Sequence, residues 1–301
     1  MERIDVQAGG TPARRLPTWM RREKRDTEQV LRLKKILREK HLHTVCQSAG
    51  CPNISECFSK PTATFMILGN VCTRHCGFCG ISKGVPEPVD IQEPEHIAEV
   101  TASLKLKHVV ITSVTRDDLT DGGAGQFAAT VRAVRDRCPE TSVEVLIPDF
   151  LGRSELLEIV LQSGVDILNH NLETIPRLYP QIRPEADYRR SLQVLARSKK
   201  IRPGIISKSG LMLGLGENLN ELVRVFGDLA NAGCDVLTLG QYLAPSQTSV
   251  PVVEYIHPEA FQTAASRARA LGIRWVHAGP FVRSSYNADE IIGRIKETSG
   301  G

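Results

Sequence analysis

The stretch Gly69-Asn70-Val71-Cys72-Thr73-Arg74-His75-Cys76-Gly77-Phe78-Cys79-Gly80 holds three cysteines in the pattern Cys-x3-Cys-x2-Cys, directly after the apolar run 64–68. Three thiolates are one fewer than an ordinary [4Fe–4S] cubane takes, so one iron would lack a protein ligand and could bind a reactant. Gly77 and Gly80 favour a cluster, because small residues let the backbone curl closely around it. The alternative is a zinc knuckle or unrelated thiols, but a structural zinc needs a fourth ligand, which His75 is poorly placed to supply.

This spacing, on a loop after a first strand, resembles the signature of the radical S-adenosylmethionine (SAM) superfamily. The resemblance implies a [4Fe–4S] cluster held by Cys72, Cys76 and Cys79. The open iron of that cluster would chelate the amino and carboxylate groups of SAM. The cluster would then deliver one electron, which splits SAM into methionine and a 5′-deoxyadenosyl radical.

A second cysteine triplet, Cys46, Cys51 and Cys57, has the different pattern Cys-x4-Cys-x5-Cys. The intervening Gly50, Pro52 and Asn53 predict a loop rather than a helix. Two triplets of unequal spacing are difficult to assign to one metal site, so we favour two [4Fe–4S] clusters with three cysteines each. A six-thiolate zinc cluster is the alternative. The cluster at Cys46, Cys51 and Cys57 would need a fourth ligand from elsewhere in the chain, or would stay open.

The composition is that of a soluble globular protein rather than of a membrane or secreted protein. The 301 residues are 41% hydrophobic and 24% charged, and no apolar run approaches the ~20 residues that cross a bilayer. The first 18 residues lack the apolar core of a secretory signal, so a cytoplasmic location is expected. In that reducing compartment eight cysteines indicate metal or redox ligation rather than disulfides. Only Cys138 and Cys234 lie outside the triplets, and we expect them to be small buried residues.

The net charge of +4 arises in one segment, because residues 21–40 hold nine Lys and Arg against four Asp and Glu. Val30, Leu33, Ile36 and Leu37 recur there at helical spacing, which predicts an amphipathic helix with a solvated charged face. The functional alternative is a docking surface for an acidic partner protein. Nucleic acid is not expected as a partner, because no aromatic residues alternate with the basic ones and no recognition motif follows.

From residue 63 onward, apolar β-branched runs alternate with helix-like segments. The expected strands are 63–68, 108–112, 142–147, 165–172, 204–213 and 235–242, and the expected helices are 94–105, 126–137, 154–163, 188–199 and 220–232. This alternation predicts an α/β fold with a parallel sheet, and six units predict a partial (β/α)6 barrel with its functional residues at the carboxyl ends of the strands. We expect three parts: an N-terminal extension (1–62), the barrel (63–272) and a C-terminal segment (273–301), the two ends covering the barrel mouth.

Polar residues follow several of the expected strands. Ser113 begins a run of hydroxyls, carboxylates and glycines that could hold a zwitterionic ligand, or could be a solvated loop. Asn171 could bind the amino-acid end of SAM, and Glu173 could accept its ribose hydroxyls. Lys208 could pair with the SAM carboxylate, or could be a surface lysine. Their position after successive strands is where a parallel barrel gathers its site.

The whole chain from about residue 16 resembles the lipoyl synthase family. Members carry the N-terminal Cys-x4-Cys-x5-Cys, the radical SAM triplet and a C-terminal Arg-Ser-Ser-Tyr, matched here by Arg283 to Tyr286. Further matches are Asp117 to Ala124, His170 to Thr174, Ser209 to Glu217 and Leu239 to Leu243. The resemblance implies that Ser285, with Ser284 as the alternative, is the fourth ligand of the cluster at Cys46, Cys51 and Cys57.

The same resemblance implies the reaction and its partners. Two sulfur atoms would be inserted at C6 and C8 of an octanoyl chain on a lysine of a carrier protein, and two SAM molecules would be consumed. The auxiliary cluster would donate the sulfur, which makes Cys46, Cys51, Cys57 and Ser285 catalytic. Expected partners are the E2 subunits of 2-oxoacid dehydrogenases, the glycine cleavage H protein, a ferredoxin or flavodoxin as electron donor, and an iron–sulfur carrier.

One segment departs from the family, because residues 245–252 lack the usual basic residues and histidine before the Pro-Val pair. This departure puts details of the carrier contact in doubt, not the chemistry. Two other functions are weighed against sulfur insertion. One is a radical SAM enzyme whose auxiliary cluster only relays electrons, and the other is a zinc-binding interaction module that uses the basic helix.

Overall fold

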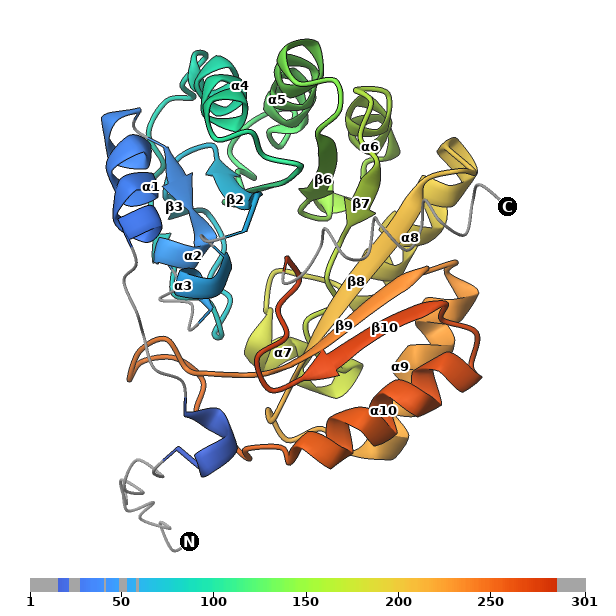
Figure 1. Ribbon diagram of the computed structural model, residues 1–301. Coiled ribbons are helices and arrows are strands. Elements are labelled where there is room, and N and C mark those ends of the chain that lie inside the picture. Colours follow the sequence, from blue (N-terminus) through green and yellow to red (C-terminus); the bar gives the residue numbers. More distant parts are fainter. Residues whose placement is uncertain (1–15, 22–27, 41, 49–52, 58–59, 286–301) are drawn as a thin grey trace, which may run out of the picture.

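The computed structural model describes residues 16–21, 28–40, 42–48, 53–57 and 60–285 (Figure 1). Its centre is one sheet in the order β1-β2-β5-β6-β7-β8-β9-β10. All six predicted strands are present, and neighbours among them pair in parallel: β2 (Thr62–Ile67), β5 (His108–Ser113), β6 (Ser142–Leu146), β7 (Ile167–Asn169), β8 (Ile206–Leu213) and β9 (Val236–Gln241). The predicted α/β partial barrel is therefore confirmed.

Two strands beyond the predicted six extend the sheet at its edges. β1 (His43–Thr44) pairs antiparallel with β2, and β10 (Trp275–Gly279) pairs in parallel with β9. Both strands come from the parts of the chain that were expected to lie outside the barrel. The N-terminal and C-terminal segments are thus attached to opposite edges of an open sheet.

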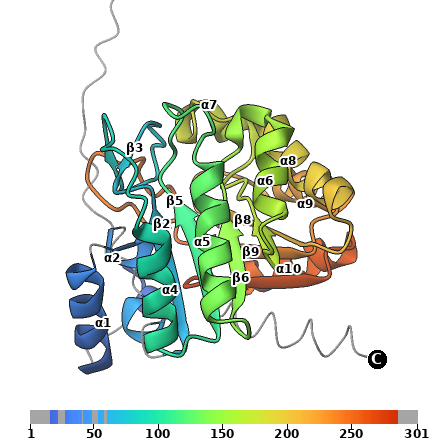
Figure 2. The ribbon, with the colours of Figure 1, turned by 90° about the horizontal axis from the view of Figure 1, so that it is seen from above.

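Helices cover the outer face of this sheet (Figures 1 and 2). The predicted ones are α4 (Glu93–Ser103), α5 (Ala124–Arg137), α6 (Ser154–Leu161), α8 (Tyr188–Ile201) and α9 (Leu219–Asn231). α10 (Pro258–Ala270) was not predicted, although its buried face (Phe261, Ala264, Ala265, Ala268) has helical spacing. Short connections add η1 (Thr18–Met20), η2 (Phe150–Gly152), η3 (Pro176–Leu178) and α7 (Tyr179–Ile182). No helix among these described residues is long and apolar enough to cross a membrane.

The N-terminal part has the predicted amphipathic helix, α1 (Glu28–Glu39), with Val30, Leu33 and Leu37 buried. The cysteine segment after it differs from the expected continuous loop. Cys46 lies in the single turn α2 (Val45–Ser48), and Cys57 ends the single turn α3 (Ile54–Cys57). Predicted loop residues therefore separate two helical turns, and Cys51 lies outside the described residues.

Apolar side chains on the outer face of the sheet and on the helices form the core, which has two large clusters. Cys234 is buried as expected, whereas Cys138 is only half-buried at the end of α5. The inner face is more polar, since alternate residues of a strand point to opposite faces. There the fully buried Lys208 donates to both carboxylate oxygens of Glu144 at 3.0 Å. Burial opposes ionisation, but the charge of Lys208 lowers the pKa of Glu144.

The C-terminal segment crosses this inner face after β10 (Figure 1). Gly240 of β9 makes room for it, because a Cβ there would stand 2.1 Å from the carbonyl oxygen of Val282. A side chain at this position would push the backbone of the segment away from the sheet. The missing side chain thus lets Ser284 and Ser285 enter the barrel.

Candidate active site

Backbone contacts hold the loop 72–79 above the carboxyl ends of the strands. Thr73 binds the Thr115 carbonyl oxygen through its amide at 3.1 Å and through its hydroxyl at 3.0 Å. Gly77 donates to the Ile182 carbonyl oxygen at 2.9 Å and accepts from the Val250 amide at 2.9 Å. A Cβ at Gly77 would meet Val250 Cγ2 at 2.7 Å, so the loop needs glycine here. This is a packing requirement in addition to the predicted curvature around a cluster.

A buried ion-pair network anchors the same loop from below. Arg74, which is 4% exposed, binds Asp117 at 2.6 and 3.0 Å and Asp149 at 2.7 Å. Arg190 donates to the other oxygen of Asp149 at 2.7 Å. Although burial opposes it, the hydrogen bond and charge of Arg74 hold the pKa of Asp149 well below its usual range. Sequence reasoning missed this network, because its members come from three separate loops and from α8.

The thiols of the loop are close enough to influence each other's ionisation. Burial raises the pKa of Cys76 to about 11, and neighbouring Cys79 and Cys72 add to the effect while Arg183 opposes it. Burial also raises the pKa of Cys79. Burial thus opposes the thiolate forms of Cys76 and Cys79, and a bound cation such as the iron of a cluster would favour them. Among the described residues no three His, Cys, Asp or Glu side chains converge on one ion, whereas a cubane takes each thiolate on its own iron.

Three of the four predicted SAM contacts lie at the carboxyl ends of two strands, β5 and β7, which β6 separates in the sheet. Asn171 follows β7 and donates through Nδ2 to Glu173 Oε1 at 2.9 Å, and Ser113 ends β5. Ser113 Oγ and Asn171 Oδ1 are buried and have no hydrogen-bond partner among the described residues. Such atoms are destabilising unless a ligand or water satisfies them, so they fit a polar ligand.

Glu173 has the backbone conformation of a site residue. Its φ of 65° is rare for a residue with a side chain, and it is held there by bridge hydrogen bonds to Gly210 at 2.9 Å and Met212 at 2.8 Å. Burial raises the pKa of its carboxyl, while Arg183 opposes the rise. A hydroxyl-rich ligand would satisfy this buried carboxyl.

Lys208 lies inside its strand rather than after it. It is inside β8, and its fully buried ammonium group is paired with Glu144. The placement after the strand is wrong, because β8 continues to Leu213. Contact between Lys208 and SAM stays a prediction, and the ion pair already neutralises its charge.

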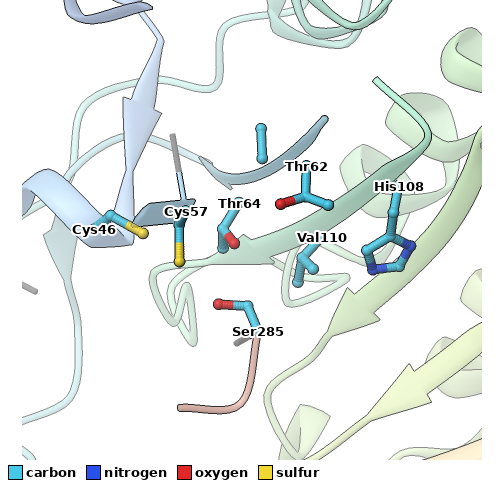
Figure 3. Close-up of a pocket in the computed structure, with 8 residues that line it drawn as sticks. Cys46, Cys57, Thr62, Thr64, His108, Val110 and Ser285 are labelled. Carbon is cyan, nitrogen blue, oxygen red and sulfur yellow. The ribbon is translucent and has the colours of Figure 1, made fainter. Parts of the chain in front are cut away.

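Cys46, Cys57 and Ser285 come together in a second place, separate from the loop 72–79 (Figure 3). We call this the auxiliary pocket; its lining residues are Cys46, Cys57, Thr62, Ala63, Thr64, His108, Val110 and Ser285. In Figure 3 the sulfur of Cys57 points toward Ser285, and the hydroxyl of Ser285 points back toward Cys57. Two thiols and one hydroxyl from distant parts of the chain fit three of the predicted ligands of a second cluster.

Ser284 and Ser285 face different surroundings. Ser284 Oγ accepts a hydrogen bond from Asn171 Nδ2 at 2.8 Å, whereas Ser285 lines the auxiliary pocket. Both serines lie in a turn, and of the two only Ser285 lines the pocket. This arrangement favours Ser285 over Ser284 as the fourth ligand.

Sequence reasoning missed two buried groups beside the predicted SAM contacts. Arg183 donates to the carbonyl oxygens of Asn171 at 2.8 Å and Leu172 at 3.1 Å. His170 binds the Ile147 carbonyl oxygen through Nδ1 at 2.9 Å, and burial together with Arg183 lowers its pKa to about 4. His170 is thus neutral at pH 7. The motif at 170–174 pointed to His170, whereas no local pattern pointed to Arg183.

Comparisons with known proteins agree on one family. The model of the Radical SAM superfamily matches residues 66–239. A lipoyl synthase of Methylococcus capsulatus is 53% identical over 299 residues, covering 98% of this chain and 92% of that protein. A lipoyl synthase of Alkaliphilus metalliredigens is 52% identical over 284 residues, covering 94% of this chain and 98% of that protein.

Solved structures of other enzymes share the fold at low sequence identity. A methylornithine synthase has a TM-score of 0.53 and 11% identity over 91% of this chain and 89% of that chain. SuiB of Streptococcus suis, bound to S-adenosylmethionine, has a TM-score of 0.56 and 9% identity over 75% of this chain and 54% of that chain. These two likenesses concern the arrangement of the barrel alone.

Proposed function

The chain belongs to the lipoyl synthase family of the radical SAM superfamily, and from that premise we propose which residues carry out its sulfur transfer. It is an enzyme that uses a [4Fe–4S] cluster and SAM and acts on a lipoyl carrier protein. We propose that it inserts two sulfur atoms at C6 and C8 of a carrier-bound octanoyl-lysine. In this proposal two SAM molecules are consumed, and an auxiliary [4Fe–4S] cluster is the sulfur-donating substrate.

The radical SAM cluster is assigned to Cys72, Cys76 and Cys79, which lie on the anchored loop after β2. Together with SAM, such a cluster supplies the one-electron chemistry that unactivated C–H bonds require, since they offer no acidic proton. The unsatisfied Ser113 Oγ and Asn171 Oδ1 support roles for these residues in SAM binding. Glu173 is assigned to the ribose hydroxyls.

The auxiliary cluster is assigned to Cys46, Cys51, Cys57 and Ser285. The observation that carries this assignment is the meeting of Cys46, Cys57 and Ser285 in one pocket away from the loop 72–79. An alkoxide is a harder ligand than a thiolate and a poor partner for iron beside three sulfurs. We therefore infer that Ser285 leaves first when the cluster gives up its sulfur.

The outer segments are assigned the roles of cover and contact surface. In this proposal residues 1–62 and 273–301 enclose the auxiliary pocket, while 63–272 forms the barrel and the SAM site. The charged face of α1 is proposed to dock the octanoylated domain of an E2 subunit or the H protein. A ferredoxin or flavodoxin would supply electrons, and an iron–sulfur carrier would rebuild the cluster. We propose that these steps occur in the cytoplasm, where thiols stay reduced.

A single-turnover experiment tests the assignment. The protein is reconstituted without oxygen, and about eight iron and eight sulfide per chain are expected for two cubanes. The auxiliary cluster is loaded with isotopically heavy sulfide, and an octanoyl-lysine peptide is treated with SAM and reductant. Mass spectrometry should find heavy sulfur in the product and iron lost from the protein.

Three results contradict the proposal. Zinc without sulfide would indicate an interaction module, and one cubane per chain would remove the sulfur donor. If the product carries unlabelled sulfur and the second cluster stays intact, that cluster acts as an electron relay and not as the sulfur donor. A Cys46→Ala variant is the control, since it should keep SAM cleavage and lose thiolation.

A further inference from the structure

A continuous chain of contacts links the proposed SAM site to the auxiliary pocket. Asn171 Nδ2 donates to Glu173 Oε1 at 2.9 Å and to Ser284 Oγ at 2.8 Å. An amide nitrogen carries two hydrogens, so these two bonds use its full donor capacity. One side chain therefore joins the SAM site to a residue of the C-terminal segment 113 positions away.

The other end of this chain is the peptide bond between Ser284 and Ser285. Ser284 lies against the inner face of the barrel, since a Cβ built at Gly210 would stand 3.0 Å from Ser284 Oγ and 2.8 Å from Asn171 Oδ1. Ser285 follows directly and lines the auxiliary pocket. Moving Ser284 away from Asn171 would thus move Ser285 relative to Cys46 and Cys57.

Asn171 has one atom left for a ligand. Its Oδ1 is buried and has no hydrogen-bond partner among the described residues, although its Nδ2 is fully used. A donor group of a bound ligand would satisfy Oδ1 and restrict rotation of the amide. A restricted amide holds Nδ2 in the direction of Ser284.

We propose that Ser284 couples the two sites, so that SAM binding at Asn171 orders the C-terminal segment and holds Ser285 in the auxiliary pocket. This inference rests on the proposed function, because it takes Asn171 as a SAM contact and Ser285 as a cluster ligand. Coupling of this kind is reciprocal. The free energy by which bound SAM stabilises the ordered C-terminal segment equals the free energy by which the ordered segment stabilises bound SAM. Ser284 is then a positioning residue and touches neither SAM nor iron.

The test compares anaerobically reconstituted wild type, Ser284→Ala and Ser266→Ala. Ser266 is an exposed serine on α10 and lies outside both proposed sites, which makes it a matched control. One neutral hydrogen bond contributes about threefold to tenfold in binding, so Ser284→Ala should raise the Kd for SAM by that factor. Ser266→Ala should leave the Kd unchanged.

Amide hydrogen exchange gives a second measurement, which needs no variant. SAM should slow exchange of residues 281–285 in wild type and in Ser266→Ala, and should not do so in Ser284→Ala. If SAM does not change the exchange rate of residues 281–285 in wild type, the coupling is overturned. This result needs no variant, so it holds even if Ser284→Ala fails to load its clusters. If Ser284→Ala binds SAM with the wild-type Kd, the coupling is also overturned, but the proposed SAM site is not. Wild type that binds no SAM overturns the proposed function and the coupling together.

Discussion

Asn53 Nδ2 donates to the carbonyl oxygen of Phe281 at 2.6 Å, across 228 positions of the chain. The backbone carbonyl of Asn53 also accepts from the Cys57 amide at 2.9 Å, which starts the helical turn that carries this thiol. Asn53 is 1% exposed. It therefore attaches the turn that bears Cys57 to the segment that bears Ser285.

Replacing Asn53 with Ala should weaken auxiliary-cluster binding while the radical SAM cluster stays. Loss of this part-buried hydrogen bond should cost about 0.5–1.5 kcal/mol and should loosen the attachment of the Cys57 turn to the segment of Ser285. Iron analysis should show a loss approaching half, with SAM cleavage retained. Asn220→Ala, at an exposed asparagine, is the control. Full iron content in Asn53→Ala would rule out this positioning role.

Replacing Ser285 with Ala should leave SAM cleavage measurable and abolish sulfur insertion. The hydroxyl faces Cys57 in the auxiliary pocket, and of the described motif residues 283–285 only Ser285 lines that pocket. Product analysis by mass spectrometry, with methionine release measured in the same sample, checks both expectations. Lipoyl formation at the wild-type rate would refute the assignment of Ser285.

Replacing Arg74 with Gln should destabilise the protein by ~3–5 kcal/mol, because it leaves Asp149 buried with Arg190 as its remaining cationic partner. The same variant should change the pH dependence of stability. A carboxyl whose folded pKa is lowered stabilises the protein above its unfolded pKa near 4 and loses that contribution as pH falls. Wild type should lose stability below about pH 4, and Arg74→Gln should lose less.

Urea unfolding between pH 3 and pH 7 measures both effects. Arg137→Gln is a suitable control, because its ion pair with Glu95 is exposed and should contribute little. If the free energy of unfolding changes equally with pH in wild type and Arg74→Gln, then Asp149 is not the source of the loss of stability at low pH.

Lys208 offers a way to separate folding from SAM binding. Lys208→Met leaves Glu144 without its cation and should cost ~3–5 kcal/mol, whereas Lys208→Met with Glu144→Leu should recover most of that loss. The predicted contact with the SAM carboxylate makes a different demand. A contact between Lys208 and the SAM carboxylate should lower SAM affinity in the double variant, even though stability is recovered. A wild-type Kd for SAM in the double variant would exclude that contact.

Much of the site was predictable because its signals are short-range. The spacings of Cys72, Cys76 and Cys79, and the alternation of strands and helices, depend on neighbours within a few turns. The same is true of α1, where Val30, Leu33 and Leu37 recur at helical spacing. The apolar run at 165–172 predicted a strand that was too long. The strand β7 ends at Asn169, and the chain then turns toward Glu173, which has a positive φ.

The sequence by itself determined the family, the barrel and the two cysteine triplets, since ligand spacing and periodicity are local properties of the chain. It could not distinguish Ser284 from Ser285, because adjacent serines have the same chemistry. Only the path of the C-terminal segment over Gly240 and its bond to Asn171 point Ser285 to the auxiliary pocket. The partner of Lys208 was likewise decided by tertiary structure, because Glu144 stands 64 positions away on another strand. Contacts between distant segments form only when the sheet brings their strands into register.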